Sequence, residues 1–136
     1  MRGPTESGRI GIATLLGVSA GYIAIGFATI ALVPRLGTSL RLVAWIASAM
    51  LLLLHVAYER RSLSSVPRTA AVRAALAVAI AAFVLAVSAM AHAIARGRPG
   101  ILWGIAIVVW PAATGLCAFI LAFLLASVIG RGESAP

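Results

Sequence analysis

Residues 74 to 95 read AALAVAIAAFVLAVSAMAHAIA, a stretch without Asp, Glu, Lys or Arg between Arg73 and Arg96. Three further stretches lack these residue types as well: residues 10–34, 42–58 and 99–130. A bilayer core about 30 Å thick is crossed by roughly 20 apolar helical residues, so each stretch predicts a transmembrane helix. The expected helices cover approximately residues 10–33, 40–59, 69–95 and 100–130, within one membrane domain over residues 1–136.

The composition agrees with a membrane protein. Of the 136 residues, 62% are hydrophobic and 10% are charged. A soluble domain of this length buries one core and cannot shield four such stretches from water. Short connections between the stretches make consecutive helices antiparallel neighbours. We therefore predict an all-α integral membrane four-helix bundle with antiparallel, up-down topology.

The basic residues predict the orientation of the bundle. All eleven are arginines, which is typical of a GC-rich genome, and the net charge is +8. The amino terminus, middle loop and tail carry Arg2, Arg9, Arg60, Arg61, Arg68, Arg73 and Arg131, whereas the other two loops carry Arg35, Arg41, Arg96 and Arg98. By the positive-inside rule, we expect a bacterial inner-membrane protein with both termini in the cytoplasm. Because the arginines flank apolar helices, the partner they indicate is the lipid bilayer and not nucleic acid.

Small residues recur at steps of three and four along the quoted stretch, and so share one helix face: Ala75, Ala79, Ala82, Ala86, Ala89 and Ala93. Bulky residues occupy the adjoining stripe: Leu76, Ile80, Phe83, Val87, Met90 and Ile94. In lipid, small residues let helix backbones approach closely. We therefore expect the alanine stripe to form a helix–helix seam and the bulky stripe to face lipid or a partner subunit.

The first and fourth helices carry small residues too. Gly17 and Gly21 form a GxxxG pair, which can mediate dimerisation but is expected here to pack mainly within the chain. The fourth helix has Gly115, Ala118, Ala122 and Ala126 at similar steps. Three small faces predict one compact bundle with little volume for a wide cavity.

The main candidate polar cluster is at the end of the second helix. His55 and Glu59 are four residues apart and share a helix face. They could relay protons or bind a divalent metal, but a tetrahedral metal site needs a further ligand, for which Glu6 is the only acidic candidate nearby. We favour a structural ion cluster without metal, in which Glu59 pairs with Arg60, Arg68 or Arg73.

Three further polar residues lie within the apolar stretches. His92 is expected to bond to Ser88 one turn earlier, and Tyr22 to point into the bundle to reach an acceptor. Two membrane histidines suggest a bis-histidine haem. In antiparallel helices, however, His55 lies opposite Arg73, so His92 is about 28 Å away along the helix axis. We therefore predict no cofactor.

The sequence contains no Lys, Asp, Asn or Gln, and no Ser-His-Asp set, phosphate-binding glycine loop or paired carboxylates. We therefore expect no catalytic residues and a non-enzymatic function. The first hypothesis is a structural or accessory subunit that packs against itself or a larger membrane complex. The alternatives are a small dimeric transporter or channel, and a haem- or quinone-associated membrane subunit.

Overall fold

The computed structural model describes the backbone of residues 4–98 and 100–131, and the side chains of residues 10–98 and 100–129. Arg2, which contributed to the predicted orientation, and Pro99, at the start of the fourth charge-free stretch, lie outside the described residues. The side chains of Glu6, Arg9 and Arg131 also lie outside them.

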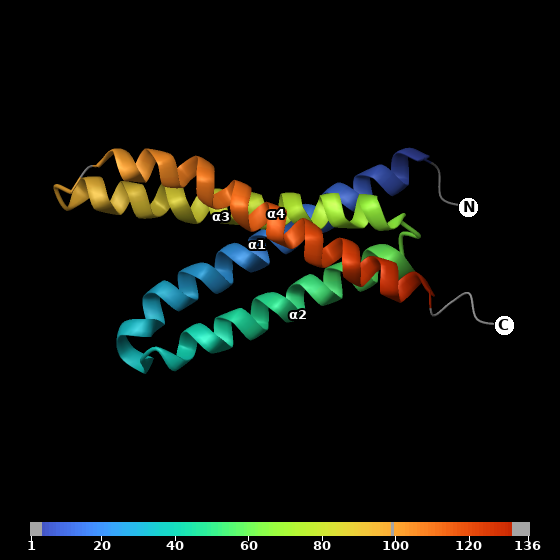
Figure 1. The fold of residues 1–136 in the computed structure, drawn as a ribbon, viewed down its shortest axis with the longest axis horizontal. Helices are drawn as coiled ribbons and strands as arrows, with labels where there is room; N and C mark the ends of the chain where they lie inside the picture. Colours follow the sequence, from blue (N-terminus) through green and yellow to red (C-terminus); the bar gives the residue numbers. More distant parts are fainter. Residues whose placement is uncertain (1–3, 99, 132–136) are drawn as a thin grey trace.

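The described chain forms four helices and no strand: α1 (Pro4–Leu36), α2 (Ser39–Arg61), α3 (Pro67–Ala95) and α4 (Ile101–Arg131). Each is long and apolar enough to cross a membrane. Consecutive helices run in opposite directions, as Figure 1 shows. The predicted all-α four-helix membrane bundle is confirmed. Helix α1 begins before its apolar span, which starts at Ile10, and its early start at Pro4 fits the preference of proline for a first helical turn.

Glycine and proline set the helix ends. Gly37 after α1 and Gly97 after α3 have φ values of +81° and +66°, which glycine adopts without a side-chain clash. Val66 is extended before Pro67, as expected for a residue that precedes proline, and α3 starts at that proline. Pro111 lies inside α4, which continues on both sides of it.

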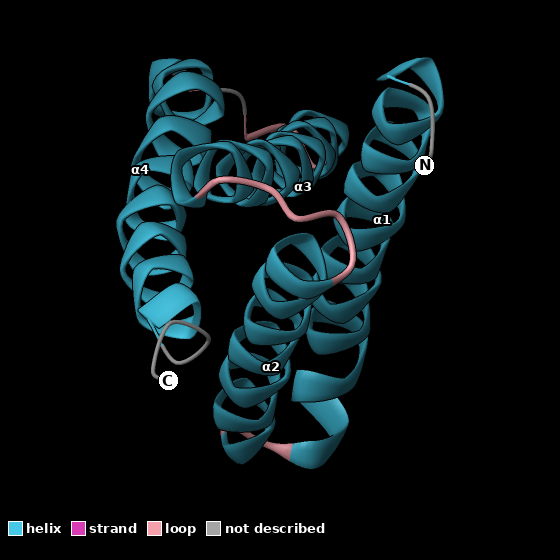
Figure 2. Ribbon diagram, turned by 90° about the vertical axis from the view of Figure 1, so that its right-hand side faces the viewer, coloured by secondary structure: helices cyan, strands magenta, loops and turns pink. Residues whose placement is uncertain are grey.

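The helices form two hairpins, α1–α2 and α3–α4, joined by the loop between α2 and α3 (Figure 2). Helix α3 packs most extensively against α4 and also packs against α1, whereas the described parts of α1 and α4 do not contact each other. We call the end that holds the α2–α3 loop the termini end, because α1 begins there and α4 ends there (Figure 1). The opposite end, with the α1–α2 and α3–α4 connections, is the loop end.

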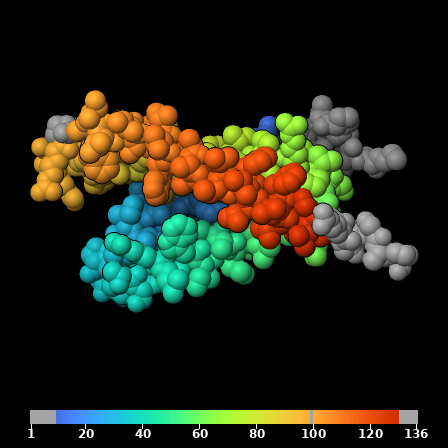
Figure 3. Space-filling view, viewed as in Figure 1, coloured from blue at the N-terminus to red at the C-terminus, as the bar shows by residue number. Residues whose placement is uncertain are grey.

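The hydrophobic core lies where α2, α3 and α4 meet near the termini end. Its buried members are mostly alanines: Leu52, Val56, Ala70, Ala71, Ala74, Ala122 and Ala126. Alanine allows the helix backbones to approach closely in this region. Towards the loop end the two hairpins diverge (Figures 1 and 3), so the bundle is compact at only one end.

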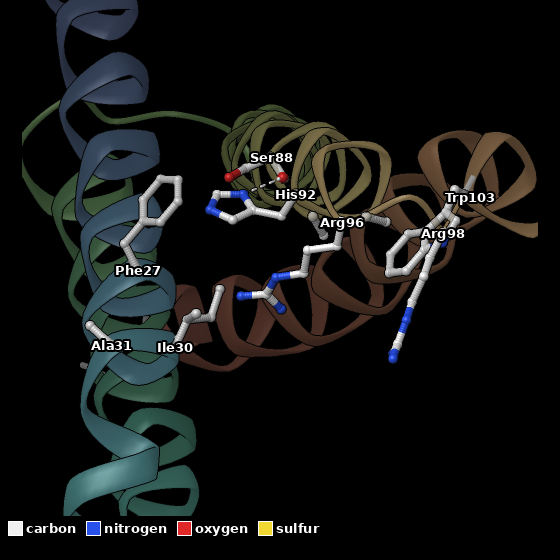
Figure 4. Close-up of a pocket in the computed structure, with 10 residues that line it drawn as sticks. Phe27, Ile30, Ala31, Ser88, His92, Arg96, Arg98 and Trp103 are labelled. Atoms are coloured by element: carbon white, nitrogen blue, oxygen red, sulfur yellow. Dashed lines mark hydrogen bonds between the residues drawn. The ribbon is translucent and has the colours of Figure 1, made fainter. Parts of the chain in front are cut away.

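The α1–α3 contact explains the divergence. Leu85 of α3 lies directly over Gly26 of α1, where a β-carbon would be 2.5 Å from a Leu85 methyl group. Beyond this contact, the larger side chains of Phe27 and Ile30 face His92 of α3 (Figure 4). Small residues permit close packing where they occur, but these larger neighbours keep the helices apart further along.

The small residues chosen from the sequence have different surroundings. In α3, Ala82 and Ala93 are buried, and the other four alanines of the stripe are partly buried. Two of these line the α4 seam, since a β-carbon at Gly115 would lie 3.2 Å from Ala79 Cβ and 3.4 Å from the Ala75 carbonyl oxygen. Helix α3 has neighbours on more than one side, so it also buries Ala70, Ala71, Ala74, Ala77 and Ala81.

The glycine pair of α1 and the bulky stripe of α3 can be placed in the same way. Gly21 faces Leu51 of α2, whereas a β-carbon at Gly17 would have no described neighbour within 4 Å. Five residues of the bulky stripe are exposed: Leu76, Ile80, Phe83, Val87 and Ile94. These apolar side chains face outward, where lipid surrounds a membrane protein.

Candidate functional site

A buried ion pair joins α2 to α3 at the termini end. Arg73 Nη1 donates a hydrogen bond of 2.8 Å to Glu59 Oε2, and the Glu59 side chain is completely buried. The Ser65 hydroxyl, from the intervening loop, donates to the same oxygen at 2.8 Å. A buried carboxylate is tolerated when a cation and further donors compensate for its lost hydration. Arg73 is thus the partner of Glu59 among the three arginines proposed from the sequence.

The same loop is held by two more bonds. The Ser65 backbone N–H donates to the Glu59 carbonyl at 3.0 Å. Arg60 Nη1 donates to the Ser65 carbonyl at 2.6 Å. Ser64, the residue before Ser65, has a φ of +49°, a left-handed conformation that a non-glycine residue seldom adopts. Side-chain and backbone bonds together hold a tight connection between α2 and α3.

Helix α1 completes the cluster through Gly11. A β-carbon at this glycine would lie 2.7 Å from Arg73 Cζ and 2.8 Å from both guanidinium nitrogens. The guanidinium therefore lies against the α1 backbone, which only a glycine at this position allows. Sequence reasoning missed both Gly11 and Ser65. Nothing in the chain distinguishes Gly11 from its other glycines, and Ser65 is one of several loop serines.

Some polar atoms of the cluster have no partner. Among the described residues, Glu59 Oε1 and both ring nitrogens of His55 make no hydrogen bond. His55 precedes Glu59 by one helical turn and is 3% exposed. An unpartnered carboxylate oxygen and an imidazole on one helix face could exchange a proton. No three described His, Cys, Asp or Glu residues are grouped to hold a metal ion.

The other predicted polar residues lie elsewhere. The Tyr22 hydroxyl donates to the Ser48 carbonyl of α2 at 3.3 Å, which links the two helices of the first hairpin. His92 is exposed near the loop end, with Nδ1 2.9 Å from the Ser88 carbonyl oxygen. His55 lies near the other end of the bundle, on α2. The two histidines therefore do not meet, and within one chain they cannot hold a single haem.

A groove lies between α1 and α3 at the loop end (Figure 4). Its volume is about 620 Å³, and the space-filling view shows the two hairpins separated there (Figure 3). Its lining combines apolar and basic side chains: Phe27, Ile30, Ala31, Ser88, Ala89, His92, Ala93, Arg96, Arg98 and Trp103. The chain thus has a closed polar cluster at one end and an open groove at the other.

Hydroxyl groups within the helices mostly bond to their own backbone. Thr14, Ser19 and Thr29 of α1 each donate to the carbonyl four residues earlier, as do Thr114 and Ser127 of α4. Such bonds satisfy the hydroxyl donor within its own helix. Comparison with protein-family models, curated proteins and solved structures found no match. The placement of the polar groups is therefore the guide to function.

Proposed function

We propose that this multi-pass membrane protein is a non-enzymatic structural or accessory subunit that acts through helix packing. The observation that supports this proposal is that Glu59 and Tyr22, two buried or partly buried polar side chains, make contacts that link one helix to another. Glu59 is enclosed by Arg73 and Ser65, and these contacts join α2, the loop and α3. Tyr22 likewise joins α1 to α2. Polar contacts that hold the helices together favour a scaffold over a catalyst or a permeation path.

The outward faces offer surfaces for a second copy or a larger complex. Gly17 is open on α1, with no described atom within 4 Å of a β-carbon placed there. The first turns of α4 are also exposed, including Ile101 and Leu102 at 83% and 75%. In lipid, a surface with small residues allows another helix to approach closely. The proposed orientation places both termini in the cytoplasm of a bacterial inner membrane.

Extraction from native membranes in mild detergent tests the proposal. We expect a discrete complex of constant stoichiometry, larger than one chain, on native gels and by native mass spectrometry. Gly17→Leu should shift the protein towards the monomer, because a bulky side chain blocks close approach. Ala49→Leu is the matched control, since Ala49 is also a small exposed residue but lies on α2, outside both surfaces. A strictly monomeric protein in native membranes would contradict the proposal.

One observation favours a second candidate, a small dimeric transporter. The bundle is closed at the termini end and open at the loop end, and a one-sided opening is the form expected of one state of alternating access. Flux of candidate solutes into liposomes separates the two ideas. Transport that is lost in His55→Ala but retained in His92→Ala would favour the transporter. The absence of flux together with a stable complex would favour the subunit.

A further inference from the structure

The groove at the loop end combines an apolar wall with basic groups at its mouth. Phe27 and Ile30 of α1 form one side, and Ala89 and Ala93 of α3 form the other. Arg96, at the end of α3, extends towards α1 across the mouth, and His92 lies one turn deeper (Figure 4). The volume of about 620 Å³ is within the usual range for ligand sites, roughly 300–1,000 Å³.

The hydrogen bonding of His92 leaves one ring nitrogen available. Its Nδ1 is 2.9 Å from the Ser88 carbonyl oxygen, which can only accept, so Nδ1 carries the proton. Nε2 is then free, and Figure 4 shows the ring turned towards Phe27 across the groove. Ser88, His92 and Arg96 follow at steps of four and share one face of α3. Ser88, His92 and Arg96 therefore lie in one line that leads from the mouth inward.

Among the described residues, the arginines of this end form no ion pair. Its four arginines are Arg35, Arg41, Arg96 and Arg98. The side-chain carboxylates of the chain are at positions 6, 59 and 133. Position 6 is in the first turns of α1, Glu59 is at the end of α2, and position 133 follows the end of α4 by two residues. Among the described side chains, therefore, no carboxylate lies at the loop end, and an anionic group from outside the chain can pair with these arginines.

We propose that the groove binds one anionic phospholipid. Its phosphate contacts Arg96 at the mouth, within reach of His92, and one acyl chain lies along Phe27, Ile30 and Ala89. Guanidinium groups bind phosphate oxygens by charge-assisted hydrogen bonds, and basic residues at a membrane surface select anionic lipids. The apolar wall distinguishes a lipid from free phosphate, which has no group to occupy it. This binding site is independent of the proposed subunit role.

Tryptophan fluorescence provides a direct test, because Trp103 lines the groove. The variant Trp45→Phe/Trp110→Phe leaves Trp103 as the only tryptophan. It is reconstituted in phosphatidylcholine vesicles with increasing fractions of brominated phosphatidylglycerol or brominated phosphatidylcholine, both of which quench tryptophan on contact. We expect half-maximal quenching at an about fivefold lower fraction of the anionic lipid, the effect of roughly one arginine contact.

Matched variants locate the effect. Trp45→Phe/Trp103→Phe leaves only Trp110, which is 59% exposed and does not line the groove, so both brominated lipids should quench it equally. Arg96→Gln should abolish the preference of Trp103 for the anionic lipid, and Arg96→Lys should retain most of it. Arg41→Gln, at the same end but outside the groove, should leave it unchanged.

Three outcomes would overturn the proposal. Equal quenching of Trp103 by the two lipids would show no selective site. An equal effect of Arg41→Gln and Arg96→Gln would show only general attraction to the charged surface. Quenching that increases as protein is diluted in lipid would show that a second copy of the chain occupies the groove. Circular dichroism of each variant checks that the helical fold is retained. Glycerol 1-phosphate carries the phosphate but no acyl chain, so an excess of it should not displace the brominated anionic lipid from the groove or relieve the quenching of Trp103.

Discussion

The two ends of the bundle accommodate arginine in opposite ways. At the termini end, Arg73 pairs with the fully buried Glu59, and α2, α3 and α4 close around alanines beside the pair. At the loop end, Arg96 faces a groove between diverging helices, and no described carboxylate lies near it. A buried carboxylate is stable only with a cation beside it, and an arginine without a carboxylate must remain where phosphate or water reaches it. The two ends therefore differ in the partner that each offers to an arginine: a buried carboxylate at the termini end, and an open groove at the loop end.

The largest effect is expected from Arg73→Ala, because it leaves the buried Glu59 carboxylate without its cation. Loss of one partner of a buried pair costs about 3–5 kcal/mol. The free energy of unfolding in mixed micelles, measured by titration with SDS, should fall by this order. Arg68→Ala is the control, since Arg68 is an exposed arginine at the start of the same helix. Its effect should be within about 0.5 kcal/mol.

Removal of the other partner of the ion pair, Glu59, tests the same contact from the side of the carboxylate. Glu59→Ala should cost less than Arg73→Ala, because the Arg73 side chain is 26% exposed and can turn to lipid phosphates. The double variant should be more stable than Arg73→Ala alone, since no unpaired charge remains buried. If the two arginine variants, Arg73→Ala and Arg68→Ala, lose equal stability, the ion pair does not hold the termini end together.

Much of this fold could be predicted from the sequence. In lipid, charged residues mark helix ends, so the sequence predicts a second helix over residues 40–59, and the structure has α2 at Ser39–Arg61. The spacing of His55 and Glu59 likewise indicated the polar cluster, because residues four apart share a helix face. Helix positions and shared helix faces depend only on residues close together in the sequence, so hydropathy and helical periodicity can predict them.

The divergence of the hairpins could not be predicted in this way. Small residues occur on α1 and α3 along most of their length, but α1 comes into tight contact with α3 at Gly11 against Arg73 and at Gly26 against Leu85. Which small residue meets which neighbour depends on the angle at which two helices cross, and hydropathy does not encode that angle. The role of Gly11 depends on a contact with Arg73 far away in the sequence, so no local pattern identifies it.

A smaller effect is expected from Gly11→Ala. The added methyl group would lie 2.7 Å from Arg73 Cζ and must push the guanidinium from its position beside Glu59. A displaced side chain costs of order 1 kcal/mol, which offsets the gain of about the same size from replacing a helical glycine by alanine, so Gly11→Ala should be about 1 kcal/mol less stable than the matched variant Gly17→Ala. Gly17→Ala, on the same helix, has no described neighbour within 4 Å and should leave stability unchanged or slightly raised. Equal losses for the two glycines would mean that backbone flexibility, and not contact with Arg73, explains the result.

The smallest effect is expected from Tyr22→Phe, which removes the bond from the Tyr22 hydroxyl to the Ser48 carbonyl between the two ends. Hydrogen bonds between membrane helices contribute on average about 0.6 kcal/mol, and at 3.3 Å this one is long, so the loss should not exceed that value. Tyr58→Phe is the control, because Tyr58 is 42% exposed on α2. Combined with Arg73→Ala, the Tyr22 effect should add independently, since the bond joins α1 to α2 within one hairpin whereas Arg73 joins the hairpins to each other. A strong coupling between the two substitutions would instead mean that the two hairpins do not pack as separate units.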